Sequence, residues 1–298
     1  MNKKSIKDID TKGKTIFIRV DFNVPIKDGK IEDDTRIRGA LPTIKYAIEQ
    51  GAKIVLASHL GRPLKDKKKA EEKGIAYDPA KYSLHPIYLY LRDSVEGLDA
   101  TDYIWVDDCV GEGVVQQIGL LEPHEILVLE NLRLHSGEEK NDPEFARRLA
   151  EGIDIYVNDA FGTAHRAHAS TEGITHHVET CVAGLLMEKE LEFLGKALNS
   201  PERPFVAILG GAKVSDKIPV IESLIERKVD KLLIGGAMAY TFFKAQGYTI
   251  GKSLVEDEMM PNALEIEAQA KAAGVELLLP TDHQVVDSYD PLNSRKAI

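Results

Sequence analysis

Short runs of apolar residues alternate along this chain with longer stretches in which apolar residues recur every three or four positions. The short runs are rich in β-branched residues and predict strands buried on both faces. In order they are 15–20, 53–57, 104–106, 125–129, 153–157, 205–209, 231–234 and 276–279. The longer stretches predict helices. These cover 33–50, 84–91, 142–152, 183–198, 236–247 and 258–273.

Strands that alternate with helices in this way predict parallel sheets joined by right-handed crossovers, an α/β fold. A length of 298 residues favours two domains or one large one. The segment 199–204 contains two prolines and breaks the pattern, so we place a boundary there. We expect a first domain over 1–182, a connecting helix over 183–200 and a second domain over 201–298. The charged run 65–74 is most simply a solvated loop or insertion.

Polar and basic side chains follow four of the predicted strands in the first half of the chain. Ligands of open α/β sheets bind at the carboxyl ends of the strands, so we expect these side chains to share one pocket. Arginine recognises phosphate and carboxylate through bidentate hydrogen bonds, which indicates a small anionic ligand. The candidates are Asp21, Asn23, His59, Arg62, Arg133, His165, Arg166 and His168, with Arg36 from the following helix.

The overall charge makes such a pocket a local feature. The formal net charge is −10, which argues against bulk attraction to nucleic acid or to an acidic membrane. Cys109 and Cys181 are too few for a disulfide framework, and we expect both to be small buried residues in a reducing compartment. The first residues have no apolar core, and no apolar run approaches a membrane span. We expect a soluble cytoplasmic protein.

Two simpler interpretations compete with the anion pocket. Any one arginine is more commonly part of a surface ion pair, and it is the repetition at strand ends that favours a site. His165, His168 and Asp159 have spacings that occur in zinc sites, but the neighbouring arginines would repel a cation.

The second half of the chain has two junctions in which a strand runs into Gly-Gly and then a helix, at Gly210-Gly211 and Gly235-Gly236. Such glycines let a ligand approach the backbone, and the following helix N-terminus favours phosphate. Lys213 and Lys217 would share a helix face and could both reach a polyphosphate. Tight helix-strand packing with solvated lysines explains the same pattern equally well. Two anion sites in two domains are what phosphoryl transfer requires.

Eight motifs in the chain together resemble the phosphoglycerate kinase family. The resemblance covers nearly the whole chain and implies two Rossmann-like three-layer lobes with parallel sheets. The motifs are RVDFNVP (19–25), DDTRI (33–37), SHLGRP (58–63), LENLR (129–133), NDAFGTAHRAHAST (158–171), AGLLMEKEL (183–191), GGAKVSDKI (210–218) and IGGAMAYTF (234–242).

The resemblance also implies an activity: reversible transfer of phosphate between 1,3-bisphosphoglycerate and ADP in glycolysis, giving 3-phosphoglycerate and ATP. Transfer would be in line, without a covalent enzyme intermediate, with Mg²⁺, in a hinge-bending and usually monomeric enzyme. Arg36 and Lys213 would be catalytic. The substrate would bind at Asp21, Phe22, Asn23, Arg36, His59, Leu60, Gly61, Arg62, Arg133 and Arg166. The nucleotide would bind at Gly211, Ala212, Lys213, Lys217, Gly235 and Gly236.

Two departures from the family pattern stand out. The region 65–82 is longer than usual, which indicates a surface insertion. The family also continues beyond Ile298, through the loop and the carboxylate that hold the nucleotide phosphates and magnesium. We therefore expect an intact substrate lobe and an incomplete nucleotide lobe, with no protein ligand for the metal. A truncated, inactive phosphoglycerate-binding protein is the main alternative, and a sugar-phosphate-binding metal hydrolase is a weaker one.

Overall fold

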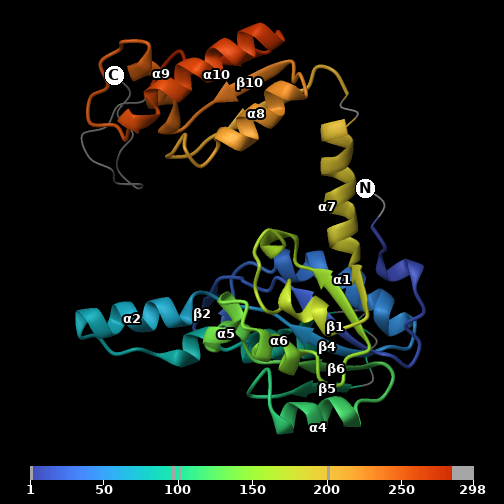
Figure 1. Ribbon diagram of the computed structural model, residues 1–298. Coiled ribbons are helices and arrows are strands. Elements are labelled where there is room, and N and C mark those ends of the chain that lie inside the picture. The colour runs from blue at the N-terminus through green and yellow to red at the C-terminus, as the bar shows by residue number, and fades with distance from the viewer. Residues whose placement is uncertain (1–2, 96–97, 99, 101, 200–201, 284–298) are drawn as a thin grey trace. The chain divides into compact units, whose positions relative to one another are not determined.

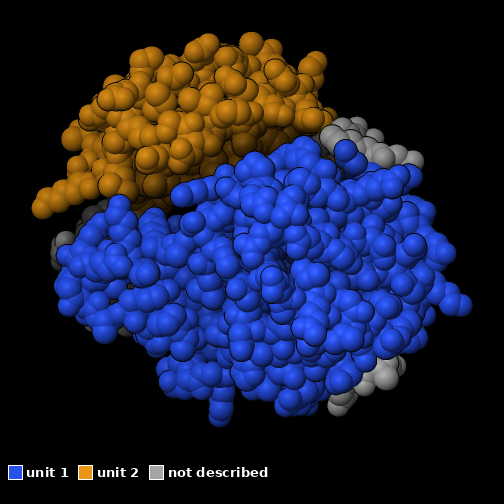
Figure 2. Space-filling view, turned by 60° about the horizontal axis from the view of Figure 1, so that its bottom comes forward, with its two compact units in different colours: residues 1–192 blue, residues 193–298 orange. Residues whose placement is uncertain are grey.

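The computed structural model describes residues 3–95, 98, 100, 102–199 and 202–283 (Figure 1). The chain divides into two compact units, residues 1–192 and 193–298 (Figure 2). The division falls inside one helix, α7 (Leu185–Asn199). Ser200 and Pro201, within the predicted break, and the residues after 283 lie outside the described residues. Among the residues described, no helix has the length and apolar character needed to cross a bilayer.

A six-stranded sheet forms the centre of the first unit, in the order β5-β6-β4-β1-β7-β8, and every pairing in it is parallel. The predicted α/β class is therefore confirmed. The strands are β1 (Thr15–Val20), β4 (Lys53–Ala57), β5 (Asp102–Trp105), β6 (Glu125–Val128), β7 (Ile155–Asp159) and β8 (Thr180–Ala183). Strand β8 was not predicted, because its four residues form no apolar run. Its Cys181 is exposed, so the expectation that both cysteines are buried was wrong for this one.

Helices cover both faces of this sheet, which explains why most residues of its central strands are apolar. Ile16 and Ile18 of β1 belong to one buried cluster, with residues of α1 (Thr35–Glu49) and α3 (His85–Ser94). Phe17 belongs to a second cluster, with residues of α4 (Glu112–Leu120) and α6 (Pro143–Leu149). Successive strand residues point to opposite faces, so a strand with two covered faces cannot alternate apolar with polar residues.

The order of the strands creates one favoured binding position. Strand β1 lies between β4 and β7, so the chain leaves β1 toward one side of the sheet and later returns to its other side. A reversal of this kind opens a crevice at the carboxyl ends of the central strands.

The charged run 65–74 is a helix, which corrects the expectation of a loop. Helix α2 (Pro63–Lys73) has proline at its first position and ends at Gly74, whose φ is 63°. Its surface carries the ion pairs Lys68–Glu72 and Lys69–Asp66, so a mixed charge run of this spacing suits an exposed helix. The helix begins directly after Arg62 and projects from the first unit (Figure 1).

Smaller elements complete the first unit. A hairpin joins β2 (Ile26–Lys27) to β3 (Lys30–Ile31), and α5 (Ser136–Glu139) precedes α6. Asp142 caps α6, because its Oδ1 accepts a hydrogen bond of 2.8 Å from the Phe145 N–H. Short 3-10 helices occur at Ile6–Asp8, Pro79–Tyr82, Leu132–Leu134, Phe161–Thr163 and Gly173–His176.

The second unit contains a three-stranded parallel sheet in the order β11-β10-β9. Its strands are β9 (Val206–Leu209), β10 (Lys231–Ile234) and β11 (Glu276–Leu278). Its helices are α8 (Ile218–Glu226), α9 (Met238–Ala245) and α10 (Met260–Ala273), and a 3-10 turn at Asp257–Met259 precedes α10. Ile221, Leu232 and Phe242 lie in its buried core.

Candidate functional site

The loops that follow β1, β4, β6 and β7 surround a cavity of about 240 Å³. All four strands are parallel neighbours in the sheet, so their carboxyl ends meet at the same edge. The cavity is lined by Asp21, Asn23, Arg36, His59, Gly61, Arg62, Arg133, Gly162, Thr163 and Arg166. The structure therefore brings together the four arginines predicted to converge, with the acidic, amide and imidazole groups expected beside them.

The loop after β1 supplies Asp21 and Asn23. Asp21 Oδ1 accepts the N–H of Asn23 at 3.1 Å, and its Oδ2 accepts Nη1 of Arg36 at 2.7 Å. Asn23 Oδ1 accepts the Gly61 N–H at 2.8 Å, which ties this loop to the next one. Phe22 is buried between them and does not line the cavity, and its N–H donates to Ser58 Oγ at 2.8 Å.

Asn131 fixes the loop after β4 through hydrogen bonds to the backbone of Leu60. The Asn131 side chain accepts the N–H of Leu60 at 3.1 Å and donates to the Leu60 carbonyl oxygen at 2.8 Å. Leu60 is buried by this contact and is not a lining residue, whereas Gly61 and Arg62 are. Gly61 has a φ of +63°, and a Cβ there would lie 2.9 Å from the ring of Tyr82. Glycine is therefore required for this turn.

Arg133 is the most buried of the four lining arginines, with 4% of its surface exposed. Its Nη1 donates to the Gly61 carbonyl oxygen at 2.9 Å. Its Nε and Nη2 are buried without a hydrogen-bond partner among the described residues, although Nε lies 3.4 Å from Glu139 Oε1. Burial lowers the pKa of Arg133, and the neighbouring Arg166 and Arg19 act in the same direction. The N–H donors of this guanidinium that lack an acceptor are available to a bound anion in the cavity.

The loop after β7 supplies Gly162, Thr163 and Arg166. A Cβ at Gly162 would lie 3.1 Å from Asp21 Oδ2, so glycine allows this loop to approach the loop after β1. Arg166 is half-buried, and its Nε lies 3.4 Å from His165 Nε2.

The cavity is positively charged because its four arginines face one carboxylate, that of Asp21. Burial lowers the pKa of His59 far below its ordinary value, and Arg19, Arg133 and Arg166 add to the effect. His59 is therefore neutral at physiological pH. The positive field belongs to the arginines alone.

His165, His168 and Asp159 do not form a metal site. Asp159 is buried, and its Oδ1 accepts the N–H groups of Leu186 at 2.9 Å and Met187 at 3.2 Å, at the start of α7. His168 is buried with its Nδ1 3.9 Å from Glu138, and it does not line the cavity. The structure assigns these residues to separate contacts.

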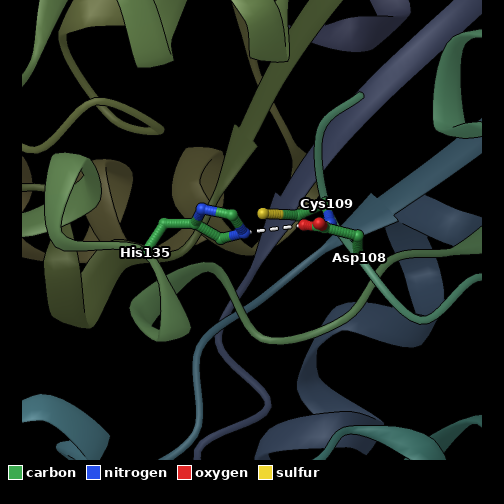
Figure 3. Close-up of side chains that lie close together, drawn as sticks. All are labelled: Asp108, Cys109 and His135. Atoms are coloured by element: carbon green, nitrogen blue, oxygen red, sulfur yellow. Dashed lines mark hydrogen bonds and ion pairs between the residues drawn. The ribbon is translucent and has the colours of Figure 1, made fainter. Parts of the chain in front are cut away.

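One group of three potential metal ligands does occur among the described residues, at Asp108, Cys109 and His135 (Figure 3). Asp108 Oδ1 accepts the Cys109 N–H at 2.6 Å and lies 2.7 Å from His135 Nε2. The Cys109 thiol points toward this pair, but burial raises its pKa well above the ordinary value, so it is protonated. These hydrogen bonds join the loop after β5, which carries Asp108 and Cys109, to His135 at the start of α5. None of the three residues lines the cavity.

In the second unit the two Gly-Gly junctions face each other. A Cβ at Gly236, whose φ is +67°, would lie 2.8 Å from the backbone N and O of Gly211. The Met238 N–H donates to the Gly211 carbonyl oxygen at 2.9 Å. The glycines therefore permit close backbone packing, as the simpler interpretation holds, and they also leave the backbone of this edge free of side chains.

Lys213 and Lys217 do not share a helix face, which corrects the sequence argument. Residues 211–217 form a loop, and α8 begins only at Ile218. The loop is held by Glu256, which accepts the Val214 N–H at 2.6 Å and the Ser215 Oγ–H at 2.7 Å. Both lysines remain on the loop that joins β9 to α8.

The sequence analysis missed the buried residues behind the first cavity. Arg19 lies in β1 with no exposed surface, and it contacts His59, Ser170 and Glu138. A signal was present, because an arginine inside a strand that is buried on both faces requires a buried partner.

The chain is similar to known proteins over nearly its whole length. The phosphoglycerate kinase family model matches residues 6–298. The phosphoglycerate kinase of Acidobacterium capsulatum is 57% identical over 295 residues, which cover 97% of this chain and 70% of that protein. That of Chlorobium chlorochromatii is 55% identical over 283 residues, covering 95% of this chain and 67% of that protein.

Solved structures agree with this result. The structure of phosphoglycerate kinase from Coxiella burnetii has a TM-score of 0.75 and 41% identity, covering 94% of this chain and 66% of that one. The chain thus spans about two thirds of the length of the relatives it matches. The match of the family model over nearly all residues shows that this chain belongs to the phosphoglycerate kinase family.

Proposed function

We propose that the cavity of the first unit binds 3-phosphoglycerate or 1,3-bisphosphoglycerate, and that the chain catalyses phosphoryl transfer between this ligand and ATP or ADP. The observation that carries the proposal is Arg133, a buried guanidinium at the cavity with two nitrogens that lack a hydrogen-bond partner among the described residues. Together with Arg62 and Arg166, it offers bidentate donors suited to a phosphate group. Belonging to the family supports this substrate class.

The polar residues of the cavity suit the rest of the ligand. Asp21 and Asn23 can accept from and donate to a hydroxyl group. Arg36 is half-exposed at the start of α1, where a helix N-terminus also favours an anion. We assign Arg36, with Lys213 of the second unit, to the phosphoryl group in transfer. Such transfer needs positioning and charge neutralisation and no protein nucleophile.

For the nucleotide we propose the loops that follow β9 and β10. Gly211, Ala212, Gly235 and Gly236 present backbone without bulky side chains, and Lys213 and Lys217 lie on the first of these loops. A phosphate at this edge would meet backbone N–H groups and ammonium groups together.

Magnesium would accompany the nucleotide, as it does for kinases in general. Magnesium prefers oxygen ligands and is commonly held by one or two carboxylates with the substrate phosphates. Within the described part of the chain, the one group of three ligands contains a thiol and an imidazole, which suit softer metals. Glu256 is committed to the Val214 and Ser215 hydrogen bonds. The described residues do not fit this ion, so we derive no step through it.

The test is steady-state transfer by the full chain from ATP to 3-phosphoglycerate with magnesium present. Turnover on the order of 1–100 per second, the range usual for kinases, would support the whole proposal. D-glycerate, which lacks the phosphate, is the matched control substrate and should not react. Binding of 3-phosphoglycerate without transfer would overturn the catalytic half of the proposal and retain the binding half. Absence of both would overturn it entirely.

A further inference from the structure

A closed group of buried polar side chains lies behind the cavity, and Arg19 is its centre. Arg19 has no exposed surface. Its Nε donates to Ser170 Oγ at 2.7 Å, and its Nη1 donates to the Val20 carbonyl oxygen. Its Nη2 lies 3.2 Å from His59 Nδ1. Because a buried cation is costly unless it is paired and hydrogen-bonded, each of these contacts helps to keep Arg19 in place.

Glu138 supplies the opposite charge. It is also fully buried, and its Oε1 lies 3.9 Å from Arg19 Nη2. Glu138 accepts the Ser170 Oγ–H at 2.6 Å and the Ser170 N–H at 2.9 Å. Ser170 therefore donates its hydroxyl proton to Glu138 and accepts from Arg19, which fixes the orientation of both charged groups. The two charges balance, so Arg19 does not need an anion from the cavity.

This arrangement decides where His59 carries its proton. An arginine guanidinium has donors only and stays protonated in proteins, so His59 Nδ1 must act as the acceptor. A neutral imidazole whose Nδ1 accepts has its hydrogen on Nε2. Nε2 lies 3.9 Å from Asp21 Oδ1, and both residues line the cavity. A second proton on His59 would place two donors face to face at the contact with Arg19.

We propose that Arg19 is a positioning residue that holds His59 in its neutral, Nε2-protonated form, so that the cavity presents a fixed N–H donor to an oxygen of the ligand. The ligand half of this inference rests on the proposed function. The four lining arginines then recognise negative charge, while His59 recognises an acceptor without adding charge. Recognition by such a donor does not depend on the ionisation of His59 near neutral pH.

The test reads the tautomer directly in the full chain. Nitrogen-15 NMR of ring-labelled histidine separates protonated from unprotonated ring nitrogens, and a His59→Gln variant assigns the signal among the nine histidines. We expect His59 to be neutral, with its hydrogen on Nε2, from pH 8.5 to about pH 5.5, well beyond the ordinary pKa of 6.5. In Arg19→Gln we expect the other tautomer to appear, because the donor that faces Nδ1 is lost. Arg147→Gln, on the exposed face of α6, is the matched control and should leave the signal unchanged.

Arg19→Gln removes a buried charge and could fail to fold. Ser170→Ala is the second variant, because it removes only the hydroxyl that orients Arg19 Nε. Ser170→Ala should also populate the Nδ1-protonated tautomer of His59, but to a smaller extent than Arg19→Gln does. Calorimetric titration with 3-phosphoglycerate adds a functional readout: dissociation constants should rise on the order of tenfold in Arg19→Gln. The ratio to the unsubstituted chain should be similar at pH 8 and pH 6, because burial keeps His59 neutral in both chains. Taking this ratio at each pH cancels the ionisation of the ligand phosphate.

An unsubstituted His59 that carries its hydrogen on Nδ1, or that titrates between pH 6 and 8, would overturn the positioning role. So would folded Arg19→Gln and Ser170→Ala variants with an unchanged tautomer. Correct tautomer signals in a chain that does not bind 3-phosphoglycerate would contradict the proposed function and leave the role of Arg19 supported.

Discussion

Asp21 Oδ2 lies 2.7 Å from Arg36 Nη1, and this ion pair joins the loop after β1 to the first turn of α1 at the edge of the cavity. The side chain of Arg36 is 53% exposed, so the pair is reachable by a ligand. An entering phosphoryl group would compete with Asp21 for the guanidinium, and because exposed pairs are weak the exchange costs little.

Arg36→Ala should therefore damage transfer more than binding. We expect kcat to fall by about 10²–10³, as when one preorganised donor to a developing charge is removed. Arg38 is the matched control, since it lies two residues away on the same helix and pairs with Asp34 outside the cavity. Arg38→Ala should leave kcat within about twofold. Equal losses in the two variants would contradict the role of Arg36.

The Arg133→Met substitution should weaken ligand binding strongly and lower the free energy of unfolding only slightly. The replacement keeps an apolar stem but removes a cation that repels its neighbours and is only partly hydrogen-bonded. We expect the dissociation constant of 3-phosphoglycerate to rise by about 10–100-fold, as for loss of hydrogen bonds to a charged group. The free energy of unfolding should fall by no more than about 1 kcal/mol. Calorimetry and urea unfolding measure the two quantities, and a large loss of stability with unchanged binding would assign Arg133 to the fold alone.

Gly184→Ala should destabilise the first unit. A Cβ at Gly184 would lie 2.2 Å from Asp159 Oδ1, the oxygen that accepts the Leu186 and Met187 N–H groups at the start of α7. We expect a loss of about 1–3 kcal/mol in unfolding free energy. Gly119→Ala in α4 is the control, because a Cβ there meets nothing within 4 Å, and it should be neutral or slightly stabilising. Equal changes of unfolding free energy in the two variants would show that Asp159 can move away from an added Cβ at Gly184 without cost.

His59 predicts a pH dependence of stability. Burial lowers the pKa of His59 in the folded chain, with further contributions from Arg19, Arg133, Arg166 and Arg36. Below the unfolded pKa of about 6.5 the unfolded chain binds a proton that the folded chain does not. Stability is therefore fully present above that pH and is lost as pH falls below it, by up to about 1.4 kcal/mol per pH unit for this one group.

The slope of stability against pH, measured by urea unfolding between pH 7.5 and 5.5, checks this expectation. His59→Gln should flatten the slope in that interval. His168 changes the slope in the same direction, because burial lowers its pKa too. A His168→Gln variant measures the contribution of His168 to the slope. An unchanged slope in His59→Gln would mean that His59 titrates normally in the folded chain.

In the second unit, Gly236→Ala should abolish ADP binding. Its φ of +67° disfavours other residues, and the new Cβ would lie 2.8 Å from the backbone of Gly211. Gly251→Ala, with nothing within 4 Å, is the control. Calorimetric titration with ADP would contradict the proposed nucleotide loops if Gly236→Ala, still folded, binds as well as Gly251→Ala.

The sequence predicted those parts of the fold that depend on local pattern. The residues of β1, β4 and β10 match the predicted strands without change, because each is a short and mainly apolar run. Strand β8 escaped detection because it is short and partly exposed. Helix α2 was assigned to a loop because its charge run has almost no apolar face, and its stability comes from proline, ion pairs and the Gly74 cap.

The candidate site divides in a similar way. Three of the four lining arginines could be predicted because each follows a recognisable strand and parallel strands end at one edge, and Arg36 because it lies in the first turn of the next helix. The partners of Arg19 could not, because Glu138 and Ser170 reach it only through the packing of α5 and the loop after β7. The loop conformation of Lys213 and Lys217 was missed because spacing alone does not show where α8 begins.

The most direct test of the account is calorimetric titration of 3-phosphoglycerate into the full chain and into Arg62→Ala and Arg166→Ala. Both arginines line the cavity, and neither is buried, so the variants should fold. We predict one binding site in the unsubstituted chain and a dissociation constant at least about tenfold weaker in each variant. Binding that survives both substitutions unchanged would show that the phosphate is held elsewhere and would contradict the central claim.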